Sequence, residues 1–343
     1  MLWTDIIDPA ELSGYARESL ENYERRQGTL AVFLPNREVA DIVVKFVKGQ
    51  TGLTDVAKFR AYDAEPEKGK RKQGQRVTLE LPALGQAIPI TEYEQLRARG
   101  GTPTEAEILN AILNTTDTVA RAVVDALELQ RGVVLATGKA TIPELGTDDD
   151  FGRDAGHTVT AAASWATTTT DVIGHIQTWT DAYRDANGTE PGAMLTSKRV
   201  VRFLAKNDQF KTALIGGASR PASLADVNAT IAAEGLPPIV TYDRQVQVDG
   251  VKQRVIDDDK VILLPAPVET DDWMGTELGA TYWGRTLTSL DPDFNIESAD
   301  QPGLVVGAYK NPKPPMGAEV ISDAIGMPVL ANANLSFVAD VVP

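Results

Sequence analysis

The sequence contains no cysteine, and this absence excludes disulfide bonds, thiolate catalysis and zinc sites built on cysteine. Histidine is nearly absent too, with only His157 and His175 in 343 residues. The glycine motifs of a serine hydrolase elbow, a phosphate-binding loop or a dinucleotide site do not occur. We therefore predict no catalytic residue, no metal site and no cofactor, and we do not expect an enzyme.

Long apolar runs are missing as well. No stretch approaches the roughly 18 consecutive apolar residues of a membrane span, and the first residues lack the basic-then-apolar pattern of a secretion signal. Cations are outnumbered, because 33 Lys and Arg face 48 Asp and Glu, and the net charge is −15. An acidic body repels phosphate groups, so we expect no membrane partner and no sequence-specific binding of nucleic acid.

The chain does have enough apolar material for substantial cores, at 43% of its residues, and its length suits roughly two domains. Its charge is uneven. Residues 58–76 hold seven cations and three anions, whereas residues 255–300 hold two cations and eleven anions. Opposite patches of this kind can pair between copies of one chain. The alternative is that both are solvated surface, since exposed ion pairs contribute little free energy.

The basic segment lies in the middle of an extended arm that we expect over residues 56–90. Residues 68–76 contain no carboxylate and no apolar side chain, so this stretch has nothing with which to bury itself in its own domain. We predict that its cations contact the acidic surface of a neighbouring copy. These cations are Lys68, Lys70, Arg71, Lys72 and Arg76.

A long helix is predicted directly after this arm. Residues 102–105, TPTE, form a capping box with proline at the first helical position. A single apolar stripe follows at helical spacing, and Gly132 is expected to end the helix. About 28 residues at 1.5 Å each give a rod of roughly 40 Å. The alternative is an ordinary core helix of unusual length. The stripe consists of Ile108, Ile112, Val119, Val123 and Leu127.

Other elements in the first half of the chain are expected from local signals. Asp8 and Pro9 predict the start of a helix that runs to about Arg26. Residues 30–35 are predicted to be a strand, and residues 39–48 favour a strand although their spacing also permits a helix. We expect strand in 133–143, a loop over 145–156, and a helix from about 167 to 187. The acidic run 148–150 in that loop is interpreted as a solvated turn.

The second half is predicted to begin with a compact α/β unit near residue 190. Ser223 and the residues after it form a capping signal, and residues 245–252 form a hairpin around an Asp-Gly turn. Residues 260–265 are expected to be a buried strand. Further strands are expected at residues 191–195, 239–242, 303–309 and 328–342.

Several short motifs, in this order, carry a family resemblance that spans nearly the whole chain. They are LELPALG at 79–85, VTYD at 240–243, KVILLP at 260–265, LGATYWG at 278–284, PGLVV at 302–306 and MPVL at 327–330. Together with the arm and the long helix, they resemble the major capsid protein of tailed bacteriophages, in particular the lambda-type major head protein family. The resemblance implies the α+β fold named after phage Hong Kong 97.

The resemblance also implies a division of the chain into parts. Residues 1–30 would be an N-terminal arm, 31–55 a strand region of the peripheral domain, and 56–90 the extended loop. Residues 91–189 would complete the peripheral domain, with its spine helix at 102–131. Residues 190–302 would form the axial domain around the symmetry axes. Residues 303–343 would be C-terminal strands that return to the peripheral domain.

By the same resemblance, the expected function is a structural one. Copies of the chain would assemble through pentamers and hexamers into the icosahedral head shell that encloses double-stranded DNA, and the protein would be found in the virion after assembly in the cytoplasm of a bacterial host. A separate scaffolding protein, a portal and a decoration protein are the further partners that it implies.

Two other functions remain open from the sequence. One keeps the fold and makes the chain an encapsulin-type compartment that holds cargo enzymes. The other is a soluble enzyme that uses carboxylates such as Asp257, Asp258 and Asp259 at a site between two α/β units.

Overall fold

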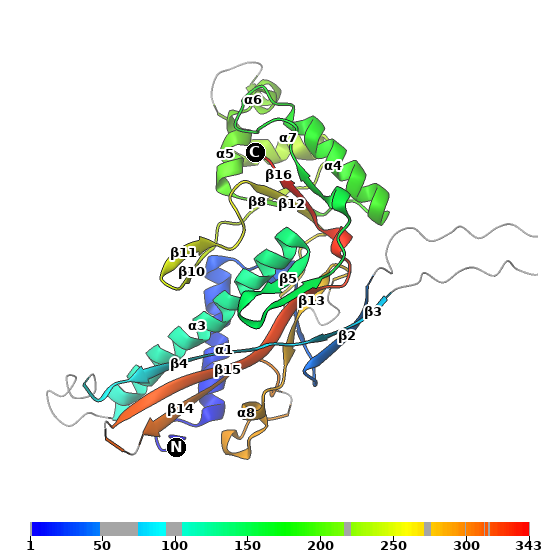
Figure 1. Ribbon diagram of the computed structural model, residues 1–343. Helices are drawn as coiled ribbons and strands as arrows, with labels where there is room; N and C mark the ends of the chain where they lie inside the picture. The colour runs from blue at the N-terminus through cyan, green and yellow to red at the C-terminus, as the bar shows by residue number, and fades with distance from the viewer. Residues whose placement is uncertain are drawn as a thin grey trace, which may run out of the picture.

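Two β-sheets, each with its own helices, lie one above the other along the long axis of the molecule (Figure 1). The N-terminus lies near one end and the C-terminus near the other. This computed structural model describes residues 2–48, 75–93, 105–215, 221–270, 276–298, 300–311, 313–314 and 316–342. We call the part that holds the long helix the spine unit, and the part with the other large sheet the second unit.

The sheet of the spine unit is organised around one long strand, β15. Strand β14 pairs with one edge of its first half and β4 with the other, while β13 pairs with its last residues, all antiparallel. Strand β1 adds parallel to β13. The strands are β1 (Asn36–Glu38), β4 (Ala83–Ile90), β13 (Gly279–Gly284), β14 (Val305–Asn311) and β15 (Gly317–Leu330). Because β4 is part of this sheet, residues 83–90 of the expected arm belong to the body of their own subunit.

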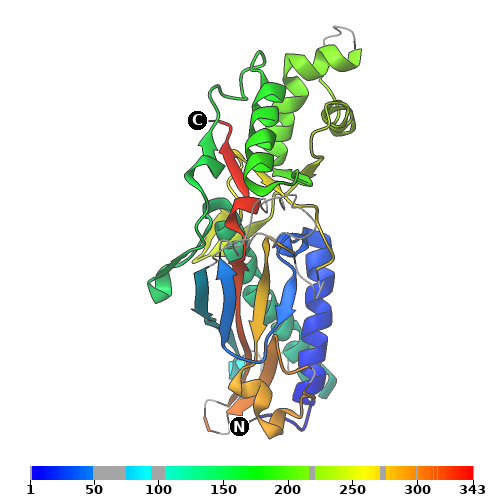
Figure 2. The ribbon, with the colours of Figure 1, turned by 90° about the vertical axis from the view of Figure 1, so that its right-hand side faces the viewer.

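Helix α3 (Glu105–Thr137) crosses one face of this sheet and continues past the glycine expected to end it. Figure 2 shows the opposite face of the sheet, with α3 behind it. The expectation that Gly132 stops the helix is wrong. The backbone oxygen of Val255 lies where a Cβ at Gly132 would be, so this glycine permits close packing inside the helix. Gly138 ends the helix with φ +74°, and its N–H donates to the carbonyl of Val134 at 2.8 Å.

Helix α1 (Pro9–Gln27) begins as predicted, because the Asp8 carboxylate accepts a hydrogen bond from the N–H of Ala10 at 2.9 Å. Its apolar face packs between α3 and β14. The hydroxyl of Ser13 accepts from the N–H of Val306 at 3.1 Å. The expected N-terminal arm is therefore, in its helical part, a layer of its own spine unit.

Residues 30–35 are not a strand. Leu30–Val32 is a single 3₁₀ turn, capped by the hydroxyl of Thr29, which accepts from the N–H of Ala31 at 3.1 Å. Leu30, Phe33 and Leu34 are buried, so their apolar character serves the core and not a sheet. The strand β1 starts only after Pro35.

The second unit has a mixed sheet with the strand order β7-β16-β12-β8-β9. Its strands are β7 (Thr158–Thr160), β8 (Ala193–Thr196), β9 (Ile239–Thr241), β12 (Lys260–Leu264) and β16 (Phe337–Asp340). Its helices are α4 (Val172–Asn187), α5 (Lys198–Lys206), α6 (Asp208–Ile215) and α7 (Leu224–Ala233).

The C-terminal segment is divided between the two sheets. Strands β14 and β15 pair in the spine sheet, whereas β16 pairs antiparallel with β12 and parallel with β7 in the second unit, so residues 303–343 do not all return to one sheet. Conversely, β13 lies within the expected axial segment and belongs to the spine sheet. Chain segments thus cross between the units more often than the sequence suggests.

Among the described residues, three two-stranded ribbons stand apart from the two large sheets. The ribbon β2 (Val43–Lys48) and β3 (Gln75–Glu80) confirms the strand favoured for residues 39–48. In β5 (Lys139–Ile142) and β6 (Thr147–Asp150), the expected loop is partly a strand, and residues 133–137 are still helix. In β10 (Gln245–Val248) and β11 (Val251–Arg254), Asp249 and Gly250 both have positive φ, as the predicted Asp-Gly turn requires. A short helix, α8 (Leu287–Leu290), lies beside the spine sheet.

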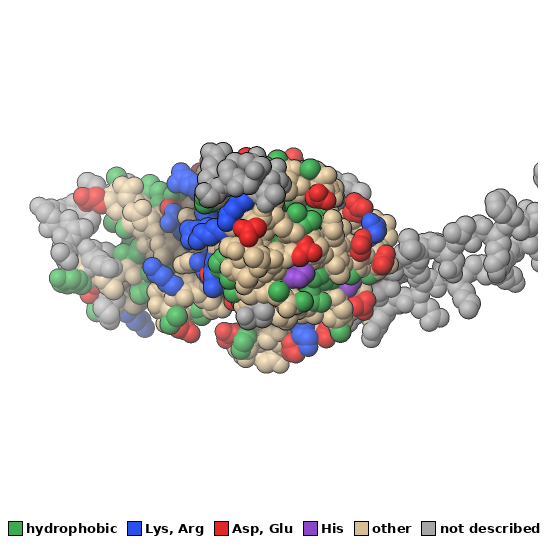
Figure 3. Space-filling view, turned by 90° about the horizontal axis from the view of Figure 1, so that it is seen from above, with side chains coloured by type: hydrophobic (Ala, Val, Ile, Leu, Met, Phe, Trp, Pro, Cys, Tyr) green, Lys and Arg blue, Asp and Glu red, His purple; other side chains and the backbone are tan. Residues whose placement is uncertain are grey.

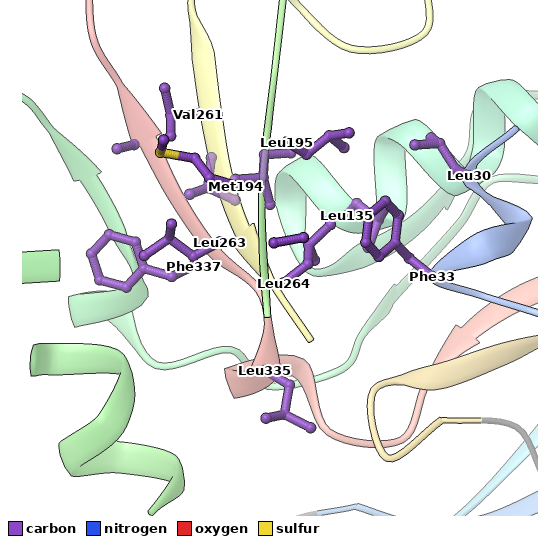
Figure 4. Close-up of a cluster of buried hydrophobic side chains, with 14 of the residues drawn as sticks. Leu30, Phe33, Leu135, Met194, Leu195, Val261, Leu263, Leu264, Leu335 and Phe337 are labelled. Carbon is purple, nitrogen blue, oxygen red and sulfur yellow. The ribbon is translucent and has the colours of Figure 1, made fainter. Parts of the chain in front are cut away.

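One apolar core joins the two units. Figure 4 shows Leu30, Phe33 and Leu135 from the spine unit facing Leu195 and Leu264 from the second unit, whereas Met194 lies on the other face of the second sheet with Leu263. All of these side chains are at most 2% exposed. A smaller cluster lies between α1, α3 and the spine sheet. The shared core fixes the second unit against the end of α3.

Candidate assembly surfaces

A buried carboxylate, Glu128, lies where α3 meets the second unit. Its side chain is fully buried and accepts hydrogen bonds from the N–H of Leu30 at 2.8 Å and the hydroxyl of Thr29 at 3.0 Å. The hydroxyl of Tyr242, just after β9, also donates to it. Burial and this carboxylate raise the pKa of Tyr242, so the phenol stays protonated. Glu128 thus connects α3, the 3₁₀ turn and the second unit.

Arg131 lies one turn further along α3 and is 1% exposed. Its guanidinium donates to Glu128 at 2.9 Å, to the amide oxygen of Asn36 at 2.7 Å and to the hydroxyl of Thr281 at 2.9 Å. It also forms an ion pair with Glu24 of α1 at 3.5 Å. Burial raises the pKa of Glu24, although the charge of Arg131 opposes this rise. The arginine therefore joins two helices to strands β1 and β13.

Arg244 brings a third charge into this joint from the second unit. Its side chain, 1% exposed, donates to Asp125 of α3 at 2.7 Å and to the carbonyl of Gly28 at 2.9 Å. Its guanidinium lies 5.0 Å from the centre of the Tyr23 ring, a cation–π contact. We call this set the joint network. It consists of Tyr23, Glu24, Asp125, Glu128, Arg131, Tyr242 and Arg244.

An open groove with a volume of about 670 Å³ runs along α1. Two of the charged side chains that line it, Arg17 and Glu24, have partners within the chain. Arg17 donates to the carbonyl of Leu304 at 3.1 Å and pairs with Asp300 at 4.0 Å, while Glu24 pairs with Arg131.

The cations predicted for the extended arm lie mostly beyond the part of the chain that the structure describes. Lys68, Lys70, Arg71 and Lys72 fall outside it. Arg76 is in β3, opposite Val47 of β2, and its side chain is exposed. The β2–β3 ribbon stands at the side of the molecule in Figure 1.

The acidic segment 255–300 divides into two parts with different surroundings. Asp258 pairs with Arg199 at 2.8 Å, and Lys260 lies between Asp259 and Asp340 at 3.9 and 3.1 Å. These charges are met by cations of the same chain. Near α8, by contrast, three carboxylates are exposed, and no ion pair with a described residue is recorded for them: Asp291, Asp293 and Glu297.

The described residues contain neither a cluster suited to a metal ion nor a helix suited to cross a membrane. No group of three or more His, Asp or Glu side chains there is arranged to hold a metal ion. Asp148 and Asp150 instead share Lys139 at 3.7 and 3.5 Å. No helix in the described part of the chain combines the length and the apolar character needed to cross a bilayer.

Comparison with known families identifies the role of this protein. The family described as phage major capsid protein E matches residues 16–281, well over half of the chain. The chain belongs to this family. No curated protein matches the sequence. The resemblance to tailed-phage major capsid proteins is therefore confirmed, and the chain is a structural shell protein of a phage capsid.

Two solved structures share the fold at low sequence identity. A phage-related protein from Bordetella bronchiseptica RB50 has a TM-score of 0.61 and 16% identity, over 97% of each chain. A protein assigned as a prophage capsid protein, from Escherichia coli CFT073, has a TM-score of 0.59 and 16% identity, over 95% of this chain and 98% of that one. The α+β capsid fold expected from the sequence is confirmed.

The residues of the joint network were missed in the sequence. Asp125, Glu128 and Arg131 are the charged residues in a largely apolar part of the long helix, between Val123 and Leu135. Charged residues three apart in such surroundings indicate a buried pair. That spacing was the available signal, but their partners in the second unit come from distant segments.

Proposed function

We propose that this capsid subunit holds its neighbours by charge, through the basic segment at residues 68–76 of the extended arm that the sequence predicts. This segment carries Lys68, Lys70, Arg71, Lys72 and Arg76. Each contact in a shell is modest, and closure of the shell makes many such contacts act together. The observation that supports this proposal is the exposed Arg76 at the base of a stretch rich in cations.

The surface that we propose as the acceptor is the acidic patch beside α8. Asp291, Asp293 and Glu297 are exposed there, and the apolar Leu287 next to them is 86% exposed. The run 257–259 suits this role less well, because Asp258 and Asp259 already have cationic partners in their own chain. A partner that brings cations would satisfy the patch near α8.

The two units are proposed to have separate positions in the shell. The spine unit would be the peripheral domain, and the second unit the axial domain that gathers around five-fold and six-fold axes. A separate scaffolding protein, a portal and a decoration protein are the proposed partners, and assembly is proposed to take place in the cytoplasm of the bacterial host.

Charge reversal tests the proposed contact. Changing the five arm cations to Glu should leave a soluble subunit and abolish shells, as measured by negative-stain microscopy and size exclusion. Asp291→Lys, Asp293→Lys and Glu297→Lys together should do the same. Combining both sets should restore shells. Lys68→Arg, Lys70→Arg and Lys72→Arg form the matched control, which keeps the charge and should assemble normally. Normal shells from the five-Glu variant would refute the contact.

A further inference from the structure

Helix α5 presents a face of one charge sign at the surface of the second unit. Val200 and Leu204 are buried and attach the helix to the core. The rest of the nine-residue helix includes four exposed cations and no anion. They are Lys198, Arg199, Arg202 and Lys206.

Few charges of the same chain meet these cations. Arg199 pairs with Asp258 at 2.8 Å and lies over the ring of Phe203. Asp243 accepts from the backbone N–H of Lys198 and pairs with Arg254 at 2.9 Å, and Asp208, just after α5, pairs with Lys211 at 3.3 Å. Among the described residues, no ion pair is recorded for the side chains of Lys198, Arg202 or Lys206. Most of this positive face therefore has no anion of its own.

The other edge of the second unit is acidic. The C-terminal half of helix α4 and the residues beside it include four exposed carboxylates. The exposed cation among them, Arg184, pairs with Asp181 and, at 3.5 Å, with Glu190. Gln177 of α4 lies 3.5 Å from Glu234, so the end of α7 adds its charge to the same edge. The carboxylates are Asp181, Asp185, Glu190 and Glu234.

The two faces point away from each other. In Figure 1, α5 lies at one edge of the second unit and α4 at the other. Figure 3 looks down on this unit, with basic side chains gathered on one side and acidic side chains along the opposite side. Surfaces on opposite edges of one subunit cannot meet within that subunit. They can meet between copies arranged head to tail, and such a contact generates a ring where the rotation closes.

We propose that the basic face of α5 docks on the acidic edge formed by α4 and the end of α7 in a second copy of this chain. This contact rests on the assembly of the subunit into a shell and adds to it a specific, directional interface between second units. Nucleic acid is the competing partner for a basic helix. The second copy is favoured because the matching acidic edge exists on the same chain and because the net charge of −15 opposes binding to DNA.

Charge swapping tests the interface. Variant A carries Arg202→Glu and Lys206→Glu, and variant B carries Asp181→Lys and Asp185→Lys. Each places like charges across the contact and should lower the yield of particles by roughly tenfold or more. Variant C combines all four changes, which restores opposite charges in every ring, and its particle yield should return close to that of the unchanged protein.

The control carries Arg26→Glu and Lys252→Glu, two exposed cations on neither edge, and should assemble normally. Circular dichroism of the unassembled subunits shows whether each variant is folded. If the unchanged protein forms no particles, the capsid function itself fails. If it forms particles and variants A and B do so equally well, the interface alone is refuted. The interface is also refuted if variants A, B and C are all folded but the particle yield of variant C does not recover.

The DNA alternative has its own signature. Variant A could form empty shells in normal yield while its filled shells contain less DNA than those of the unchanged protein. That result would mean that the basic face contacts nucleic acid, and the proposal would be overturned. Recovery of particle yield in variant C, with unchanged DNA content per particle, supports contact between copies.

Discussion

The charges of the joint network and the charges on α5 differ in where their partners lie. Glu128 and Arg131 are almost fully removed from solvent, and each has several partners in its own chain. The cations of α5 are solvated, share one sign, and mostly lack such partners among the described residues. A buried charge must be matched within the fold, because desolvation costs several kcal/mol per ion. A solvated charge needs no partner in its own chain, so a second subunit can supply one.

This difference separates two roles within one protein. The joint network holds α1, α3 and the second unit in a fixed relation, so it serves the fold of the subunit. The α5 face and the acidic edge serve the contact between subunits. Changes at the first should appear in the stability of the isolated subunit, and changes at the second should appear in assembly.

The largest effect is expected from Glu128→Gln. The substitution keeps the shape of the side chain but leaves Arg131 and Arg244 without their shared buried carboxylate. Loss of one partner from a buried pair costs about 3–5 kcal/mol. Urea unfolding of the dissociated subunit measures this free energy. Asp125→Asn, at a carboxylate whose side chain is 27% exposed, is the control and should cost less. A loss below about 1 kcal/mol for Glu128→Gln would contradict a role of the network in the fold.

A smaller, pH-dependent effect is expected from Glu24→Gln. Because burial raises the pKa of Glu24 above its usual 4.5, the folded state binds its proton more tightly than the unfolded state does. Its contribution to stability is present below pH 4.5 and is lost as the pH rises through the raised pKa. Glutamine has no proton to lose, so the stability of the variant relative to the unchanged protein should increase with pH across this window.

Urea midpoints measured at several pH values between about 4 and 7 give this difference directly. The control is Glu21→Gln, at an exposed position on the same helix, which should show no such trend. If the Glu24→Gln and Glu21→Gln curves run parallel, Glu24 does not titrate as its buried position implies.

The smallest effect on subunit stability is expected from Arg202→Gln with Lys206→Gln. Both side chains are exposed, and surface substitutions of this kind change the free energy of unfolding by no more than about 0.5 kcal/mol. The same variant should nevertheless assemble less well than the unchanged protein, because it weakens the proposed contact between copies. If urea unfolding shows a loss of several kcal/mol in the free energy of unfolding, these cations stabilise the subunit as the joint network does. The proposed difference between the two sets of charges would then be wrong.

Local signals in the sequence predicted the elements whose ends are set by neighbouring residues. The start of α1 follows from Asp8 and Pro9, and the β10–β11 hairpin follows from Asp249 and Gly250. These signals work because the cap or turn is completed within a few residues. The errors occurred where a distant segment decides the outcome, as for residues 30–35, which fill the core around the end of α3.

The candidate surfaces divide in the same way. Segments of uneven charge, such as residues 68–76 and 255–300, are visible in the sequence, and so is the family resemblance. The basic face of α5 and the edge with Asp181 and Glu234 become opposing surfaces only when the sheet of the second unit fixes the helices around it. The joint network could not be predicted from the sequence, because Glu128 and Arg244 are more than a hundred residues apart in the chain.

The sequence by itself determined that this protein is an acidic, cysteine-free α+β chain with a long helix and a basic arm, and its motifs were enough to indicate a capsid subunit. Only the tertiary structure decided that α1 is part of the body, that Gly132 lies inside a helix, and that β16 joins the second unit. The physical reason is range: caps, turns and charge runs act between near neighbours. Burial and strand pairing, in contrast, depend on which distant segments exclude water together.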